Sequence, residues 1–262
     1  MKTTLITGAS SGIGEAFARR LAARGENLAL VARSEDKLAS LCNELGQAHN
    51  VDAQYVALDL TQEDAAAKLF AETNRRGLAV EMLINNAGFG SMGEFATLDL
   101  ARELEMIDLN VKALVALTHL YLKPMRERKS GTILNVASTA AFQGVPYMAT
   151  YAATKAFVLA FSEALWDEHR AQGIHVMALC PGVTETNFFA AAQTDRPPMR
   201  VAQTADQVVE TALKGLKRGK SHVISGWTNY IMTESERLVP RSVVARVAGK
   251  AMRPKYGKNS DK

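Results

Sequence analysis

The sequence of 262 residues has little of what several classes of protein depend on. Cysteine occurs only as Cys42 and Cys180, which match no metal or redox spacing and build no disulfide framework. The five histidines are scattered and form no ligand pair at metal spacing. We therefore expect neither a metal centre nor a fold that disulfide bonds hold together.

Long apolar runs are also missing. None approaches the roughly 18 residues of a membrane span, so we expect no integral membrane segment. A strand-like run begins at Thr3, with no basic or apolar segment of the signal-peptide type before it. We expect a cytoplasmic protein that has no nucleic-acid partner.

What the chain does contain is alternating strand and helix patterns, in a composition with 47% hydrophobic and 22% charged residues. This alternation predicts α/β architecture, a doubly wound parallel sheet of the Rossmann type in three α/β/α layers. With no repeat or linker, we expect one domain over 1–262, with its core at about 3–225. Strands are expected at 4–7, 27–31, 53–58, 82–84, 131–137, 174–179 and 222–225, and helices after residue 14, at 35–45, 63–73 and 98–126, and from Tyr151 to about Arg170.

A glycine-rich loop joins the first expected strand to the first expected helix. Gly8, Gly12 and Gly14 follow the pattern G-x-x-x-G-x-G. Glycine lets the backbone turn tightly and approach a phosphate, and the amino end of a helix offers free N–H groups to the anion. The loop therefore predicts a dinucleotide-binding site.

The same loop also permits a different interpretation. Residues 8–12 contain G-x-S-x-G, the nucleophile elbow of α/β-hydrolases, with Ser10 as the nucleophile. That enzyme needs an oxyanion-hole loop from an earlier strand, but only seven residues precede the motif. It also needs a histidine at a strand end, whereas His175 and His222 begin strands. A serine hydrolase is therefore the weaker alternative.

The end of the second expected strand indicates which nucleotide fits. An acidic residue there binds the ribose 2′-hydroxyl of NAD, whereas an arginine accommodates the 2′-phosphate of NADP. This chain has Arg33 followed by Ser34, with no acid between Val31 and Ser34. The sequence predicts NADP(H) as the cofactor.

Two residues four positions apart stand out by their chemistry. On a helix, Tyr151 and Lys155 share one face. A phenol with a pKa of about 10 is a poor acid near neutrality, and a nearby cation lowers that pKa. Tyr147 lies one turn earlier, but its neighbour four residues on is Tyr151. The spacing predicts Tyr151 as a proton donor or acceptor.

Taken together, these features resemble the short-chain dehydrogenase/reductase superfamily in its single-domain form. Five signatures stand in the family's order: Thr7 with the glycine loop, Asn-Asn-Ala-Gly at 85–88, Asn110, Ser138, and Tyr151 with Lys155. A sixth, Pro-Gly at 181–182 with Thr186 nearby, follows the sixth expected strand, and the resemblance covers roughly 3–188.

The resemblance implies a role for each of these residues. Tyr151 would exchange a proton with the substrate, and Lys155 would lower its pKa and hold the nicotinamide ribose. Ser138 would hydrogen-bond the substrate oxygen, and Asn110 would hold a water in the proton relay. The residues implied for the nucleotide are Gly8, Ser10, Ser11, Gly12, Ile13, Gly14, Arg33, Ser34, Asp59, Leu60, Asn86, Ala87, Gly88, Pro181, Val183, Thr184 and Thr186, with Tyr151 and Lys155.

One departure and one further alternative remain. Thr184 stands where the family usually has valine, which bears on the nicotinamide contact alone. Some proteins of this fold bind NADP as sensors without chemistry, and such a protein would be expected to lack the tyrosine or the lysine. This chain has all four catalytic residue types, which favours an enzyme.

Substrate specificity is expected from Phe89 and from the segment after Pro181. There an apolar run at 188–192, beginning with Phe188, is expected to form a helix that acts as a lid. An apolar wall indicates a small to medium, largely apolar carbonyl compound or alcohol.

The last 26 residues are unusually basic. The segment 237–262 has eight basic residues and one acid, which gives +7 and leaves −3 for the remainder of a chain with net charge +4. The pattern predicts a basic amphipathic helix that could lie on an anionic membrane or pack against protein. Because the segment has no tryptophan or phenylalanine, we favour packing within the protein or its homodimer or homotetramer.

Overall fold

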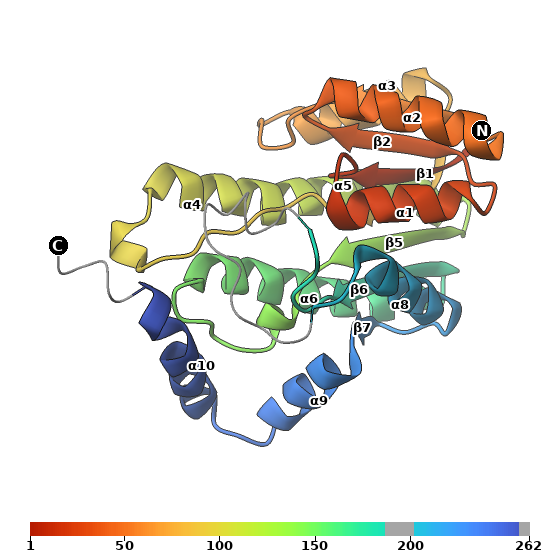
Figure 1. The fold of residues 1–262 in the computed structure, drawn as a ribbon. Helices are drawn as coiled ribbons and strands as arrows, with labels where there is room; N and C mark the ends of the chain where they lie inside the picture. The colour runs from red at the N-terminus through yellow and green to blue at the C-terminus, as the bar shows by residue number, and fades with distance from the viewer. Residues whose placement is uncertain (187–201, 257–262) are drawn as a thin grey trace.

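The computed structural model describes residues 1–186 and 202–256. Seven parallel strands form one sheet with the order β3-β2-β1-β4-β5-β6-β7, and helices cover both faces (Figure 1). The predicted doubly wound α/β fold is confirmed. The lid helix expected at 188–192, which begins with Phe188, lies outside the described residues. The strands are β1 (Lys2–Thr7), β2 (Leu28–Ala32), β3 (Ala53–Ala57), β4 (Ala79–Asn85), β5 (Gly131–Val136), β6 (Ile174–Cys180) and β7 (His222–Ile224).

The predicted helices of the core are present, with shifts of a few residues at most boundaries, but the helix between β6 and β7 (Ala205–Lys217) was not predicted. In the described part of the chain, no helix is both long enough and apolar enough to cross a membrane. The α-helices are α1 (Gly12–Ala22), α2 (Glu35–His49), α3 (Ala65–Arg75), α4 (Leu100–Ile107), α5 (Leu114–Glu127), α6 (Ala149–Arg170), α8 (Ala205–Lys217), α9 (Trp227–Glu236) and α10 (Arg241–Tyr256).

Two apolar layers hold the helices on the sheet. Phe17 of α1, Leu38 of α2 and Val208 of α8 are fully buried in one layer. Leu69 of α3 and Leu117 of α5 are buried in the other. Burial of one such side chain stabilises the fold by about 1.5–3 kcal/mol. The strands are therefore covered on both faces, as a parallel sheet requires.

A buried chain of polar side chains ties the sheet to α5 and α6. The amide nitrogen of Asn85 donates to Thr118 Oγ1 (3.0 Å) and to Asn135 Oδ1 (2.9 Å). Asn135 Nδ2 donates in turn to Ser162 Oγ on α6 (2.9 Å). Hydrogen bonds of this kind fix one packing register, because breaking one strands a polar group in the core. The network holds the helix that carries Tyr151.

The long helix expected over 98–126 is present from Leu100 to Glu127, but it is not α-helical throughout. Between α4 and α5 the structure has a π-helical segment, Asp108–Ala113, which contains Asn110. Such segments occur frequently at functional sites, because the wider turn re-aims side chains. Hydrophobic periodicity does not reveal the extra residue in one turn.

The carboxyl-terminal region differs from the expected single amphipathic helix. Two helices, α9 and α10, extend from the layered body in a V shape (Figure 1). The sequence analysis missed α9, which begins at Trp227, ten residues before the basic segment. One side of α10 packs closely against the loop before α6. At Gly249 there is little room for a side chain, because an added Cβ would lie 3.2 Å from Pro146 Cγ.

Candidate active site

One cavity of about 440 Å³ opens at the carboxyl ends of the strands. It lies beside β1 and β4, the neighbouring strands between which the order of the strands in the sheet reverses. Crevices at this point bind ligands in doubly wound sheets. Of the residues predicted for the site, Gly14 and Asn110 are not among those that line the cavity. The predicted residues that line the cavity are Gly8, Ser10, Ser11, Gly12, Ile13, Arg33, Ser34, Asp59, Leu60, Asn86, Ala87, Gly88, Phe89, Ser138, Tyr151, Lys155, Pro181, Val183, Thr184 and Thr186.

The glycine loop has the shape of a phosphate cradle. Gly8 and Gly12 adopt left-handed backbone angles, with φ of 64° and 60°, which side chains rarely allow. At Gly14 an added Cβ would overlap the carbonyl oxygen of Gly8. Ser11 is the N-cap of α1 but makes no side-chain capping bond. Because no side-chain cap occupies them, the N–H groups of the first turn are available to an anion in the cavity that Gly12 and Ile13 line.

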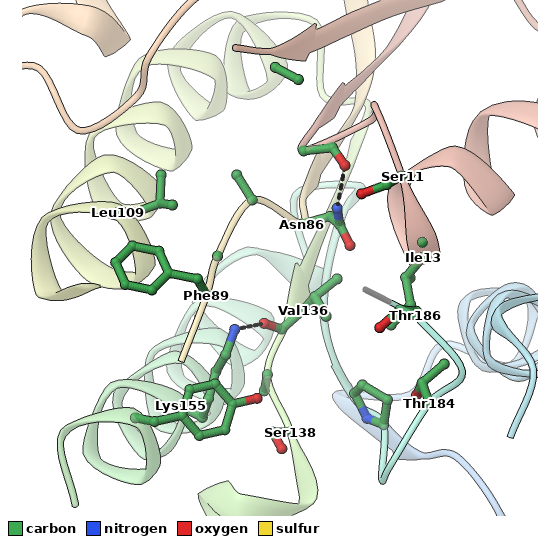
Figure 2. Close-up of a pocket in the computed structure, with 18 of the residues that line it drawn as sticks. Ser11, Ile13, Asn86, Phe89, Leu109, Val136, Ser138, Lys155, Thr184 and Thr186 are labelled. Carbon is green, nitrogen blue, oxygen red and sulfur yellow. Dashed lines mark hydrogen bonds between the residues drawn. The ribbon is translucent and has the colours of Figure 1, made fainter. Parts of the chain in front are cut away.

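The loop after β4 clamps the glycine loop in place. Asn86 Nδ2 donates to the carbonyl oxygens of Thr7 (2.9 Å) and Gly8 (3.2 Å), and Figure 2 draws Asn86 beside Ser11. The backbone N–H groups of Asn86 and Ala87 both donate to Thr7 Oγ1 at 3.0 Å. Four hydrogen bonds thus fix the spacing between the two loops.

The end of β2 presents a cation to the cavity. Arg33 lines the cavity and is exposed, and it makes no ion pair with any other described residue. Asp59, two residues after β3, also lines the cavity, and its carboxylate accepts from the backbone N–H (3.0 Å) and hydroxyl (2.8 Å) of Thr61. The arrangement can hold a phosphate at Arg33 without displacing an existing partner.

The buried end of the cavity brings Ser138, Tyr151 and Lys155 together. Tyr151 is 8% exposed and hydrogen-bonds Ser138, which follows β5. Lys155 Nζ donates to the carbonyl oxygen of Val136 at 2.8 Å, and Figure 2 shows this bond near Ser138. A hydroxyl, a phenol and an amine therefore converge at one point, as acid–base chemistry requires.

The electrostatics at this point differ from the expectation. Burial raises the pKa of Tyr151 to about 12, and the hydrogen bond with Ser138 opposes that rise. Burial also lowers the pKa of Lys155 to about 8. The expected lowering of the Tyr151 pKa by Lys155 is not seen, because the ammonium bonds Val136 and lies 5.8 Å from the Tyr151 ring centroid.

Tyr147 does not lie on the catalytic helix, and the expected position one turn before Tyr151 is wrong. It precedes α6, and its backbone is left-handed with φ of 66°. Its carbonyl oxygen accepts from the N–H of Gly93 at 2.9 Å. An irregular loop of this kind is not visible in residue spacing alone.

Asn110 links the loop after β4 to the catalytic helix. Its Oδ1 accepts from the N–H of Phe89 (3.1 Å), and its Nδ2 donates to the Phe89 carbonyl (2.9 Å) and to Thr154 Oγ1 (3.2 Å). The side chain is 1% exposed. In this structure the amide holds protein groups, and its role in a water relay stays a prediction.

An apolar wall continues from Tyr151 toward the outside. Figure 2 shows Phe89 and Leu109 along this side of the cavity. Sequence reasoning found Phe89 but missed the other members, because they come from loops and helices far apart in the chain. The wall residues that it missed are Met92, Arg102, Leu109, Met148 and Met252, which comes from α10.

Arg102 is the cation on this wall. Its guanidinium carbon lies 3.7 Å from the centroid of the Phe89 ring, and its Nη1 donates to Glu105 Oε2 at 2.8 Å. The contact fixes the orientation of the Phe89 ring, since a cation over an aromatic face is attracted by the ring quadrupole.

The hydrolase alternative loses support from the placement of the histidines. No histidine is among the described residues that line the cavity with Ser10. His175 Nε2 contacts the Lys220 carbonyl (2.8 Å), and His222 Nδ1 lies 2.8 Å from Glu163. A nucleophilic serine needs a base within hydrogen-bond reach, and Ser10 has none there.

Comparisons with known proteins agree with this geometry. The family model described as short chain dehydrogenase matches residues 2–197. A very-long-chain 3-oxoacyl-CoA reductase from Rattus norvegicus is 32% identical over 271 residues, which cover 98% of this chain and 83% of the relative.

Two solved structures have the same fold. The short-chain dehydrogenase from Sphingobium yanoikuyae in complex with NADPH gives a TM-score of 0.83 at 32% identity, covering 91% of this chain and 94% of that one. The bulky-bulky ketone specific alcohol dehydrogenase from Comamonas testosteroni gives 0.78 at 31% identity, covering 91% and 92%.

Proposed function

The chain belongs to the short-chain dehydrogenase family and is an oxidoreductase, and we propose that it uses NADP(H) to interconvert a carbonyl and an alcohol on a largely apolar substrate. The observation that carries the proposal is the convergence of Ser138, Tyr151 and Lys155 between the glycine loop and an apolar wall. A nucleotide site and a proton donor therefore share one cavity.

NADP(H), when bound, exchanges a hydride with the carbon of the substrate carbonyl. The cavity fits this group, because the positive-φ glycines leave room for a pyrophosphate on the amino end of α1. Arg33 would hold the 2′-phosphate through charge-assisted hydrogen bonds. The NADPH bound in the Sphingobium structure supports the same choice of nucleotide.

Tyr151 would give its proton to the substrate oxygen in reduction and accept it in oxidation. A phenol with a pKa of about 12 stays protonated through the neutral range, which suits the donor role in reduction. Accepting a proton in oxidation requires the phenolate, which becomes more abundant as the pH rises. Ser138 would hold the same oxygen by a hydrogen bond, and Lys155 would hold the nucleotide ribose near Tyr151. Asn110 would position the loop that carries Phe89.

The substrate would lie against the wall of Phe89, Met92, Met148 and Met252. This wall offers shape and apolar area rather than hydrogen bonds, which favours a ketone or secondary alcohol with bulky apolar substituents. The named activities of the relatives, on 3-oxoacyl-CoA and on bulky ketones, support the same class.

The test is a substrate panel with the unmodified protein. It includes 3-oxoacyl thioesters, bulky ketones, small aldehydes and small polar ketones, followed by NADPH absorbance with NADH in parallel. We expect turnover of apolar ketones or thioesters with NADPH, and much slower turnover of small polar carbonyls. Tight NADPH binding without turnover of any compound would instead favour a nucleotide-binding sensor.

We also propose that the protein is a homo-oligomer. Leu100, Leu104 and Ile107 of α4 are 65%, 52% and 40% exposed on one helix, which supports a contact with a second copy. Light scattering of the purified protein tests this, and a monomer at micromolar concentration would contradict it.

A further inference from the structure

The outer surface of α9 and α10 is the most apolar exposed region in the described part of the chain. Of the 14 large hydrophobic residues that are exposed there, eight fall within 21 consecutive positions. Monomeric proteins rarely expose apolar residues in such a cluster unless the surface binds something. The eight residues, which we call the apolar ridge, are Trp227, Tyr230, Ile231, Met232, Leu238, Val239, Val243 and Val247.

The largest side chains of the ridge share one face of α9. Trp227, Tyr230 and Ile231 are spaced three and four residues apart, and they are 72%, 47% and 49% exposed. The rings of Trp227 and Tyr230 stack with centroids 6.2 Å apart. Leu238, two residues after α9 ends, is 88% exposed. Tryptophan and tyrosine rings are the side chains enriched where a membrane meets water.

Basic residues surround the ridge. Arg241, Arg246, Lys250 and Arg253 of α10 are all exposed, and Arg237 in the connection to α9 is exposed and pairs with Glu234 at 3.1 Å. The segment 237–262 has net charge +7, whereas the rest of the chain has −3. This charge separation attracts the helical arm to an anionic surface and repels it from a second arm of the same kind.

The inner face of α10 already has its partner, as the sequence analysis favoured. Ala245 lies against Gly144, and Gly249 lies against Pro146. Met252 joins the apolar cluster of Phe89 and Tyr151 in the active-site wall. The outer face, with Val243, Val247, Arg246 and Lys250, points away from these contacts. The same helix therefore contributes to the wall of the substrate cavity on one face and to the ridge on the other.

We propose that the apolar ridge and its basic rim bind the surface of an anionic lipid membrane. The ridge side chains would enter the headgroup region, while the arginines and lysines contact acidic headgroups. The absence of tryptophan from the basic segment had favoured packing against protein, but Trp227 and Tyr230 of α9 supply the aromatic residues for this surface. The proposal does not depend on the proposed reaction.

The test is co-sedimentation of the full chain with lipid vesicles at physiological salt. Phosphatidylcholine vesicles with one third phosphatidylserine are compared with pure phosphatidylcholine. We expect at least about tenfold tighter binding to the anionic vesicles, because each basic residue near the surface adds electrostatic attraction. Raising the salt concentration should weaken this binding.

Two variants address the two parts of the surface. The double variant Trp227→Ala with Ile231→Ala and the double variant Arg246→Glu with Lys250→Glu should each lose at least about tenfold in affinity for the anionic vesicles. Phe157→Ala on α6, an exposed apolar residue outside the ridge, is the control and should keep it. Melting temperature and NADPH affinity, measured for every variant, show that each remains folded.

The outcomes separate the membrane from other occupants. Protein that stays in solution with both kinds of vesicle overturns the proposal. Normal vesicle binding by the α9 variant also overturns it. A third contrary result is an unmodified protein that forms an oligomer without binding vesicles, together with an α9 variant that is monomeric. In the last case the ridge is a contact between two copies.

Discussion

The nucleotide end and the substrate end of the cavity use different parts of the chain. At the glycine loop, the backbone itself forms the wall, with left-handed angles at Gly8 and Gly12 and four hydrogen bonds to the loop after β4. At the other end, side chains such as Phe89 and Met252 form it. Tyr151 stands where the two meet.

This difference implies different tolerance of substitution. A backbone wall has no spare volume, so one added carbon at the glycine loop displaces the main chain. A wall of methionines has unbranched, adaptable side chains, so a substitution there reshapes the cavity and leaves the fold intact. A substitution in the glycine loop should therefore weaken nucleotide binding strongly, whereas a substitution at the substrate end should change the selectivity for substrates.

The largest expected effect comes from Gly14→Ala. Its Cβ would overlap the carbonyl oxygen of Gly8, so the loop must move and NADPH affinity should fall by at least about 100-fold. Fluorescence titration with NADPH measures it. Gly46→Ala is the matched control, because its Cβ would lie 3.5 Å from the Val51 carbonyl, an ordinary contact. A Gly14→Ala protein with unchanged affinity would mean that the phosphates lie elsewhere.

A smaller effect at the same end is expected from Arg33→Ala. Loss of a charge-assisted contact worth about 1.5–3 kcal/mol should weaken NADPH binding about tenfold or more and leave NADH binding unchanged. Arg24→Ala, an exposed arginine away from the cavity, should alter neither. Equal affinity of the unmodified protein for both nucleotides would rule out Arg33 as the selecting residue.

The pH dependence tests the residues between the two ends. Burial lowers the pKa of Lys155 to about 8, so its ammonium is present below pH 8 and is lost as the pH rises. If this charge holds the nucleotide, kcat/KM for NADPH should fall about tenfold per pH unit above 8. Tyr151 stays protonated there, with a pKa of about 12. In the control variant Lys155→Arg, the residual kcat/KM should not vary over the same pH range. A kcat/KM that stays constant above pH 8 in the unmodified protein would contradict the role of the Lys155 ammonium in holding the nucleotide.

The smallest effect is expected at the substrate end, from Met252→Ala. Loss of a half-buried apolar side chain should raise KM for a bulky ketone about threefold to tenfold, with NADPH affinity unchanged. Val247→Ala, on the outer face of the same helix, is the control and should change neither constant when lipid is absent. An unchanged KM in Met252→Ala would place the substrate away from α10.

The nucleotide end could be predicted from the sequence because its determinants are local. A strand, a glycine pattern and a helix follow one another, and parallel strands bring the ends at Arg33, Asp59 and Asn86 to one edge. The fold could be predicted for the same reason, because the hydrophobic periods of strands and helices are visible in short stretches of sequence. The family resemblance then supplied the roles of Ser138, Tyr151 and Lys155.

The substrate end could not be predicted, because its members lie far apart in the chain. Met92, Met148 and Met252 follow no common period, and they meet only after α10 folds back over the cavity. The π-helical segment around Asn110 and the left-handed Tyr147 are also tertiary features. Burial reversed the expected direction of the Tyr151 pKa, which residue spacing alone could not show.

Whether Tyr151 is the proton donor is tested most directly by Tyr151→Phe, assayed for turnover and for NADPH affinity. The phenyl ring keeps the shape of the site but has no proton to exchange, so turnover should fall to the limit of detection while NADPH affinity stays within about twofold. Tyr147→Phe, the control, should keep most of the activity. If Tyr151→Phe retained more than a few per cent of turnover while Tyr147→Phe lost it, the proton donor would be Tyr147, and the account of this site would be wrong.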